Sequence, residues 1–141
     1  MQLPPKLAVS VVLDFGALSA FERIALEQCA RGALFKQVAS ELQVGPSRLS
    51  RLLASATSKL GLGSSTEALR LMGGILGPRV AHLETLTRAE REVFDLIKAG
   101  LANQQIATRR GTTERTIANQ VGAVLRKTGL SSRRAVIASR V

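Results

Sequence analysis

The sequence has 141 residues, of which 45% are hydrophobic, so the chain is long enough for one ordinary domain or two very small ones and can bury a core. Aromatic residues make up only 3%, and neither Trp nor Tyr occurs, which argues against a surface that stacks single-stranded nucleic acid. A single Cys and a single His exclude a disulfide framework and a structural zinc site, and we expect no metal, no cofactor and no catalytic centre.

The charge indicates a polyanionic partner. Twenty Lys and Arg residues against ten Asp and Glu residues give a net charge of +10, which favours nucleic acid first and an anionic membrane second. The longest apolar stretch near the start, residues 7–13, is too short to cross a bilayer, and no signal-peptide cleavage site follows it. We therefore expect a cytoplasmic, nucleoid-associated protein without a membrane partner. Residues 1–17 are expected to form an N-terminal arm.

An internal repeat runs through the rest of the chain at an offset of 68 residues. Residues 18–23 align with residues 86–91, and the register then holds to the end of each copy without a gap. The aligned identities include Gly32 with Gly100, Gln37 with Gln105, Ala39 with Ala107, Lys59 with Lys127, and Gly61 with Gly129. The repeat predicts a tandem duplication. Its parts are a first domain over 18–72, a linker over 73–85 with a hinge at 73–78, and a second domain over 86–141.

Each copy opens with a helix whose start is well defined. Ser19 and Thr87 are good N-cap residues, and Glu22 and Glu90 follow three residues later, which is the spacing of a capping box. Both helices are expected to end just before a glycine that can take a left-handed conformation.

Three further helices are predicted in each copy. A short second helix, over 35–42 or 103–110, carries an aliphatic residue followed by Ala, which allows close packing at a sharp angle. The third helix begins at Pro46 in the first copy and after Thr113 in the second, and the fourth covers 65–72 or 133–141. The expected buried stripes of the third helices are Leu49, Leu53, Ala56 and Leu60, and Ile117, Val121, Val124 and Leu125. The predicted fold is all-α, with two tandem four-helix domains that each contain a helix-turn-helix.

Four ordered segments of the second copy carry a family resemblance. They are Leu86-Thr87-x-x-Glu90-Arg91-Glu92-Val93, Ala99-Gly100-Leu101-Ala102-Asn103-x-x-Ile106-Ala107, Glu114-Arg115-Thr116-Ile117-x-Asn119 and Lys127-x-Gly129-Leu130-x-Ser132-Arg133. Together they resemble the LuxR/GerE-type helix-turn-helix, and this many ordered matches are more specific than one short motif. The first copy resembles the same family but has drifted.

The resemblance implies a DNA-binding surface on the third helix of each copy, which in the family lies in the major groove. In the second copy, the family positions that face base edges match Ala118, Asn119 and Gly122, with Gln120 beside them. The family positions that hold phosphates match Arg115, Thr116 and Lys127. The second helix begins with Asn103 and Gln104, where its N-terminus can approach the DNA backbone. In the first copy the matching residues are Lys36, Ser47, Arg48, Ser50, Arg51, Ala54 and Lys59. The fourth helix matches the family's dimerisation element.

Several base-facing positions depart from the family pattern. Ala118 and Gly122 are too short for bidentate base contacts, so direct readout in the second copy falls mainly to Asn119 and Gln120. Leu52 stands at the Gln120 position in the first copy, where it can either meet a thymine methyl or pack. The pair Arg133-Arg134 reads equally well as a phosphate clamp or as a solvated helix start.

These observations lead to a hypothesis and two alternatives. The hypothesis is a transcriptional regulator that binds double-stranded DNA sequence-specifically through two helix-turn-helix domains, without a sensor domain, because fewer than twenty residues precede the first repeat. The second copy is expected to bind DNA better, since residues 1–72 carry a net charge of +3 and residues 73–141 carry +7. One alternative is an adaptor whose first domain binds RNA polymerase or another regulator. The other is a weakly specific architectural DNA-binding protein.

The pattern leaves one further choice open. The fourth helices can pack against each other within the chain, or they can pair two chains as a homodimer.

Overall fold

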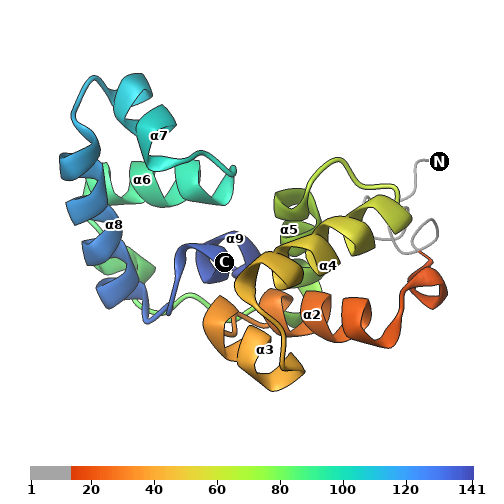
Figure 1. The fold of residues 1–141 in the computed structure, drawn as a ribbon. Helices are drawn as coiled ribbons and strands as arrows, with labels where there is room; N and C mark the ends of the chain where they lie inside the picture. Colours follow the sequence, from red (N-terminus) through yellow and green to blue (C-terminus); the bar gives the residue numbers. More distant parts are fainter. Residues whose placement is uncertain (1–13) are drawn as a thin grey trace, which may run out of the picture.

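The computed structural model describes residues 14–141, and this part of the chain is all-helical, as predicted (Figure 1). It contains two short 3-10 helices and eight α-helices: η1 (Phe15–Ala17), α2 (Ala20–Ala30), α3 (Phe35–Leu42), α4 (Pro46–Lys59), α5 (Ser65–Leu76), η2 (Leu83–Thr85), α6 (Arg88–Lys98), α7 (Asn103–Arg110), α8 (Glu114–Thr128) and α9 (Arg133–Ala138). None of these helices is both long and apolar enough to span a membrane. The predicted N-terminal arm lies outside the described residues, apart from its last four positions.

The backbone takes the same conformation at positions that are 68 residues apart. The order of elements from η1 to α5, the first run of helices, is repeated from η2 to α9, the second run. Six left-handed residues form pairs at this offset, and each closes a helix: Gly32 and Gly100, Gln43 and Gly111, and Gly61 and Gly129. The seventh, His82, precedes η2 and has no left-handed counterpart. The offset read from the sequence is therefore present in the backbone of the described chain.

Both predicted capping boxes are present. In α2 the Ser19 hydroxyl accepts the Glu22 N–H at 3.1 Å, and the Glu22 carboxylate accepts the Ser19 N–H at 2.7 Å. In α6 the corresponding distances between Thr87 and Glu90 are 3.1 Å and 2.9 Å. The first helix of each run therefore begins where the capping pattern predicted, because two backbone donors at each start are satisfied by side chains.

The next two helices of each run are joined by a short turn and pack against each other, α3 with α4 and α7 with α8. The small residues Ala39 and Ala107 are buried, as expected at close crossings. In α4 the predicted stripe is buried throughout, whereas in α8 Val121 and Leu125 are only partly buried. The α8 stripe is therefore narrower than predicted, and Thr128 completes it by donating its hydroxyl to the Val124 carbonyl at 2.7 Å.

The fourth helices pack against each other within the chain, and α9 also packs against α2 (Figure 1). The expected hinge at residues 73–78 is wrong, because α5 continues through Gly73 and Gly74 to Leu76. A side chain at Gly73 or at Gly77 would overlap the backbone of Ala138. These glycines therefore permit close approach between the two fourth helices rather than bending of the chain.

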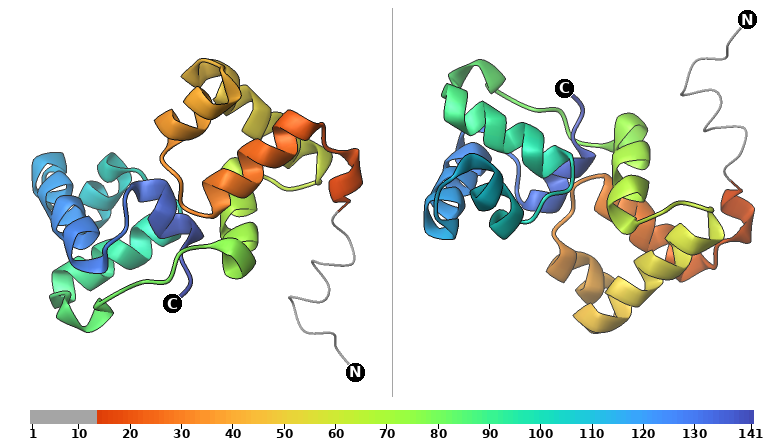
Figure 2. Two further views of the ribbon diagram at one scale, coloured as in Figure 1. Left: turned by 90° about the horizontal axis from the view of Figure 1, so that it is seen from below. Right: turned by 90° about the horizontal axis from the view of Figure 1, so that it is seen from above.

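The remaining linker is held by hydrogen bonds to the end of the chain. Arg140 donates its N–H to the Pro78 carbonyl at 2.8 Å, and its carbonyl accepts the Val80 N–H at 3.1 Å. The Arg140 guanidinium also donates to the Gly77 carbonyl at 2.8 Å, and Ala81 donates to the Thr128 carbonyl at 3.1 Å. Residues 77–81 therefore lie against the second run of helices and act as a fixed connection, which is visible from two directions in Figure 2.

Gln43 is expected to weaken the first run slightly. It holds a left-handed conformation, with φ of 56°, at the position where the second run has Gly111. Because a Cβ is disfavoured there, Gln43→Gly should raise the free energy of unfolding by about 1 kcal/mol. Thermal unfolding measures this, and Gly111→Gln, the matched change, should lower it by a similar amount. A lower melting temperature for Gln43→Gly would contradict this expectation.

Candidate nucleic-acid interface

The third helix of the second run carries an exposed polar face. Arg115, Thr116, Ala118 and Asn119 are all exposed on the N-terminal half of α8. The Thr113 hydroxyl caps this helix by accepting the Thr116 N–H at 3.2 Å. A helix N-terminus with exposed donors and an arginine is suited to hold phosphate oxygens, while Asn119 supplies an amide that can bond a base edge.

Two further residues predicted on this face are less accessible. Gln120 is half-buried, and its side-chain carbonyl oxygen is buried without a hydrogen-bond partner in the described chain. Gly122 is also half-buried, and a Cβ built there would lie 3.6 Å from an Arg126 guanidinium nitrogen. Asn119 is therefore the most accessible amide on α8, and Gln120 has an unsatisfied acceptor that a donor could complete.

The third helix of the first run presents a longer polar face. Its exposed members are Ser47, Arg48, Ser50, Arg51, Ala54 and Lys59. Arg48 and Arg51 have no ion-pair partner within the part of the chain that the structure describes. Leu52 is half-buried and packs against the hydrophobic core. Packing therefore accounts for this leucine, and the polar face remains uninterrupted.

The two lysines predicted to hold phosphates make ion pairs inside the fold. Lys59 lies 2.7 Å from the Glu22 carboxylate, and Lys127 lies 2.7 Å from the Glu90 carboxylate. Each glutamate therefore joins the start of the first helix of its run to the end of the third helix. Both lysines remain partly exposed, so each ammonium group can contact a phosphate while it stays paired with its glutamate.

The ion pairs shift the pKa of both glutamates downward. Hydrogen bonds from Lys59, Ser55 and the Ser19 backbone lower the Glu22 pKa from 4.5 to about 2, against a smaller opposing effect of burial. The Glu90 pKa is also lowered, chiefly by the hydrogen bond from Lys127 and then by the Thr87 backbone. Both carboxylates are therefore ionised at neutral pH and hold their lysines in place.

The second helices contribute three more predicted residues. Lys36 and Gln104 occupy the same position of α3 and α7, and both are exposed. Asn103 is half-buried, and its side-chain oxygen accepts a hydrogen bond from Arg133 at 2.5 Å. The Asn103 amide is thus directed toward α9, and of these three side chains only Lys36 and Gln104 are unobstructed.

The pair Arg133-Arg134 joins elements of the fold. Arg133 also donates to the Leu101 carbonyl, and burial lowers its pKa. The Arg134 guanidinium carbon lies 4.0 Å from the centre of the Phe35 ring, a cation–π contact between the two runs of helices. Neither interpretation left open by the sequence describes this pair fully, because both side chains are used in intramolecular contacts.

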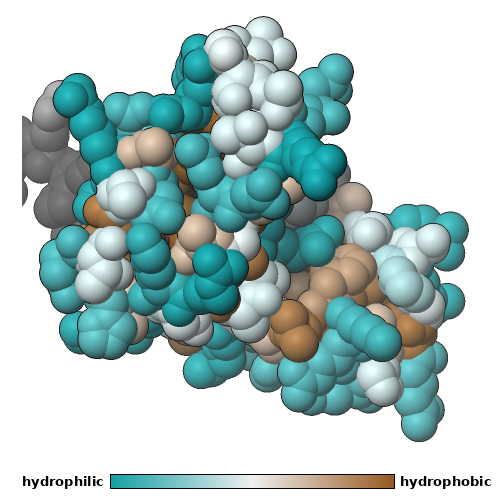
Figure 3. Space-filling model, turned by 90° about the vertical axis from the view of Figure 1, so that its left-hand side faces the viewer, coloured by the Kyte–Doolittle hydropathy of each residue, from teal (hydrophilic) through white to brown (hydrophobic). Residues whose placement is uncertain are grey.

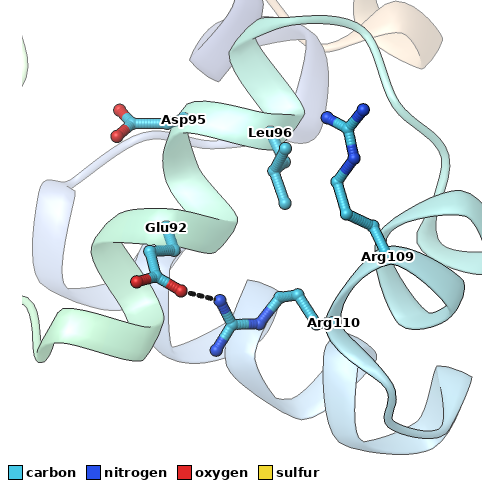
Figure 4. Close-up of a pocket in the computed structure, with 5 residues that line it drawn as sticks. All are labelled: Glu92, Asp95, Leu96, Arg109 and Arg110. Atoms are coloured by element: carbon cyan, nitrogen blue, oxygen red, sulfur yellow. Dashed lines mark hydrogen bonds and ion pairs between the residues drawn. The ribbon is translucent and has the colours of Figure 1, made fainter.

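A groove of about 530 Å³ between α6 and α7 contains basic side chains that are absent from the predicted DNA-binding residues (Figure 4). Arg110 pairs with Glu92 and lowers the pKa of that carboxyl, which holds α7 against α6. Arg109 extends along the same groove and forms no ion pair within the described residues. Arg126, on the last turn of α8, is also exposed. The sequence signal for Arg109 and Arg126 is the pair of basic residues in the last turn of α7 and the pair in the last turn of α8.

The predicted residues form two separate surfaces rather than one. Those of α4 and those of α8 belong to different runs and lie on either side of α9 (Figure 1). Viewed from the side on which α8 lies, the surface is mainly hydrophilic or neutral, and hydrophobic residues occupy only small patches (Figure 3). Within the described chain no group of three or more His, Cys, Asp or Glu side chains could hold a metal ion.

Comparison with known proteins finds a similarity for part of the chain. No curated protein and no solved structure gives a significant match. Residues 84–139 match the GerE family, described as bacterial regulatory proteins, luxR family. The matched segment contains the whole of α6, α7, α8 and α9. Residues 84–139 are therefore similar to the DNA-binding helix-turn-helix domain of luxR-family regulators.

Proposed function

We propose that this protein is a transcriptional regulator that binds double-stranded DNA sequence-specifically through two tandem helix-turn-helix domains, residues 18–72 and 86–141. The observation that carries the proposal is the exposed face of Arg115, Thr116 and Asn119 on α8, within the segment similar to luxR-family regulators. The net charge of +10 supports the same partner, because phosphate contacts dominate the affinity of such proteins.

Support for a second DNA-binding domain comes from the first run of helices. Its capping box, its left-handed positions and its Glu22–Lys59 ion pair all have counterparts 68 residues later. The α4 face carries Arg48 and Arg51 where α8 has Thr116 and Asn119. A basic and exposed face at the matching position is what a second DNA contact requires.

Each residue of the two faces then has a proposed role. Phosphates are held near the helix N-termini by Arg115, Thr116, Ser47 and Arg48. The bases are faced by Asn119, Gln120, Ser50 and Arg51, and close approach is allowed by Ala118, Gly122 and Ala54. The DNA backbone is bordered by Lys36, Gln104, Asn103, Lys59 and Lys127. The two lysines and Asn103 contribute least in this assignment, because their polar groups already have partners in the fold.

A second candidate is the adaptor, in which the first run binds a protein such as RNA polymerase or another regulator. The observation in its favour is that Phe21 and Ile24, three residues apart on α2, are both exposed. Leu52 gives the adaptor no support, since that side chain packs on the core.

Alanine substitution separates these proposals. In fluorescence anisotropy with a duplex enriched from a random pool, Arg115→Ala and Arg48→Ala should each weaken binding by about tenfold and reduce the log–log salt slope by about one. Arg88→Ala is the matched control, because this α6 side chain is 95% exposed and lies outside both faces.

The outcomes differ between the candidates. Loss of affinity for both variants supports two DNA-binding domains. If Arg48→Ala and Arg51→Ala bind as tightly as the unaltered chain while Arg115→Ala does not, the adaptor is favoured. Strong binding with no enriched sequence indicates an architectural protein. Unchanged binding of Arg115→Ala would refute the proposed function itself.

A further inference from the structure

The contact between the two runs of helices is made by equivalent elements. The buried side chains of α5 include Ala68, Leu69 and Met72, and the last four residues of α9, Ala135–Ala138, are buried. The two helices pack against each other more extensively than either packs against α4 or α8. This is the face that would otherwise pair two chains, so one chain already contains the contact that a homodimer through its fourth helices would need.

The turns beside these helices meet them in a reciprocal way. A Cβ built on Gly32, in the turn after α2, would lie 3.6 Å from the Ala135 methyl of α9. A Cβ built on Gly100, in the matching turn after α6, would lie 2.8 Å from the Thr66 methyl of α5. Ala135 corresponds to residue 67 at the 68-residue offset, directly beside Thr66. The turn after each first helix therefore meets the fourth helix of the other run. The match is approximate, because the atoms nearest to a Cβ at Gly32 belong to the Pro78 ring, at 3.0 Å, and α2 packs against α9 whereas α6 has no comparable packing against α5.

Contact between equivalent elements, here α5 with α9 and each turn with the opposite fourth helix, is typical of a two-fold contact. A head-to-tail arrangement would instead bring two different surfaces together. The two runs are thus related by an approximate two-fold rotation, and α4 and α8 lie on either side of the central contact (Figures 1 and 2). The hydrogen bonds of Arg140 to the linker fix this arrangement.

The exposed polar faces of α4 and α8, which we call the reading faces, occupy equivalent positions in the two runs but differ in chemistry. Asn119 corresponds to Arg51 at the 68-residue offset, and both are exposed. Their neighbours on the same faces, Ser50 and Ala54 or Ala118 and Gly122, are all small. Arg makes bidentate hydrogen bonds to the O6 and N7 of guanine, whereas Asn makes them to the N6 and N7 of adenine.

Building on the proposed function, we infer that one chain binds a pair of inverted half-sites that differ at the mirror-related base pair facing Arg51 and Asn119. Guanine faces Arg51 in one half-site, and adenine faces Asn119 in the other. The target is thus an imperfect palindrome bound by a monomer, with half-site centres about one helical turn apart. The single-chain geometry fixes the orientation of the half-sites, and Arg51 and Asn119 determine how they differ at this base pair.

Selection from random duplex DNA tests this inference with the full chain and two reciprocal variants. Arg51→Asn should replace guanine by adenine at its position and leave the other half-site unchanged, so that adenine occupies this mirror-related position in both halves. Asn119→Arg should have the opposite effect, with guanine at this position in both halves. Each variant should bind the original sequence about tenfold more weakly than its own. Arg88→Asn is the control, and its enriched sequence should match that of the unaltered chain.

Three results would overturn the inference. Enrichment of directly repeated half-sites would exclude the two-fold relation, and two chains per duplex in sedimentation would exclude monomeric recognition. Unchanged bases for both reciprocal variants would exclude Arg51 and Asn119 as the distinguishing residues. Each of these leaves the proposed function standing, because the chain would still select DNA. Absence of any DNA binding would instead refute the proposed function, and this inference with it.

Discussion

Gly77→Ala and Gly73→Ala should each lower the free energy of unfolding by about 1–3 kcal/mol, which is the usual cost of overpacking. The cause is steric, since a methyl group at either position would overlap the carbonyl oxygen of Ala138. The obstacle is backbone rather than a flexible side chain, so α5 and α9 must separate to accommodate it. The loss should therefore lie toward the upper end of this range.

Thermal unfolding and denaturant titration measure the effect, and Gly74→Ala provides a matched control. Gly74 lies in the same helix, and a Cβ there meets nothing within 4 Å. Because Ala is the better helix former, this variant should gain about 0.5–1 kcal/mol. The opposite signs at adjacent positions distinguish close packing from helix propensity. Equal gains for all three variants would show that α5 and α9 are not in contact.

The same variants connect packing to DNA recognition. If α5 and α9 separate, the two reading faces are joined only by the linker, and the second half-site is captured with a lower effective concentration. Gly77→Ala should therefore tolerate a wider range of spacings between half-sites than the unaltered chain does. A spacing series of duplexes measures this, and an unchanged preference would show that the contact does not set the spacing.

Local signals in the sequence predicted most of the helix starts and ends. The capping boxes at Ser19 and Thr87 and the turn glycines act through bonds within one helix, so they are readable without knowledge of the tertiary structure. The hinge prediction failed for the opposite reason. Gly73 and Gly77 follow a composition typical of linkers, but their role depends on Ala138, which is more than sixty residues away in the chain.

The interface was likewise predictable where the signal lies within one helix, and not where it depends on contacts between helices. The helical period placed most of the α4 and α8 faces on the exposed side, apart from the half-buried Gln120 and Gly122, because burial of one stripe leaves the opposite face in solvent. The period could not indicate that Asn103 is bonded to Arg133 or that Lys59 and Lys127 pair with glutamates. These partners lie in other helices and become neighbours only when the domain packs.

Glu22→Gln should destabilise the first run at neutral pH by about 1–2 kcal/mol, because hydrogen bonds to a charged group are stronger than those to a neutral one. The Glu22 carboxylate receives hydrogen bonds from Lys59, from the Ser55 hydroxyl and from the Ser19 N–H. Lys59 is 43% exposed, so solvent screens its ion pair, and the two neutral donors supply part of the effect.

The pH dependence of this loss follows from the direction of the pKa shift. In the folded chain the Glu22 pKa is about 2, below its ordinary value of 4.5, so the folded state favours the ionised form. The stabilisation is therefore complete above about pH 4.5 and is lost as the pH falls toward 2. The difference in melting temperature between the unaltered chain and Glu22→Gln should shrink over this window. Glu27→Gln, on the same helix and without an ion pair among the described residues, should show no such convergence. A difference that stays constant from neutral pH to pH 2 would mean that Glu22 acts by packing alone, and the charge that joins α2 to α4 would then contribute nothing to the position of the reading face.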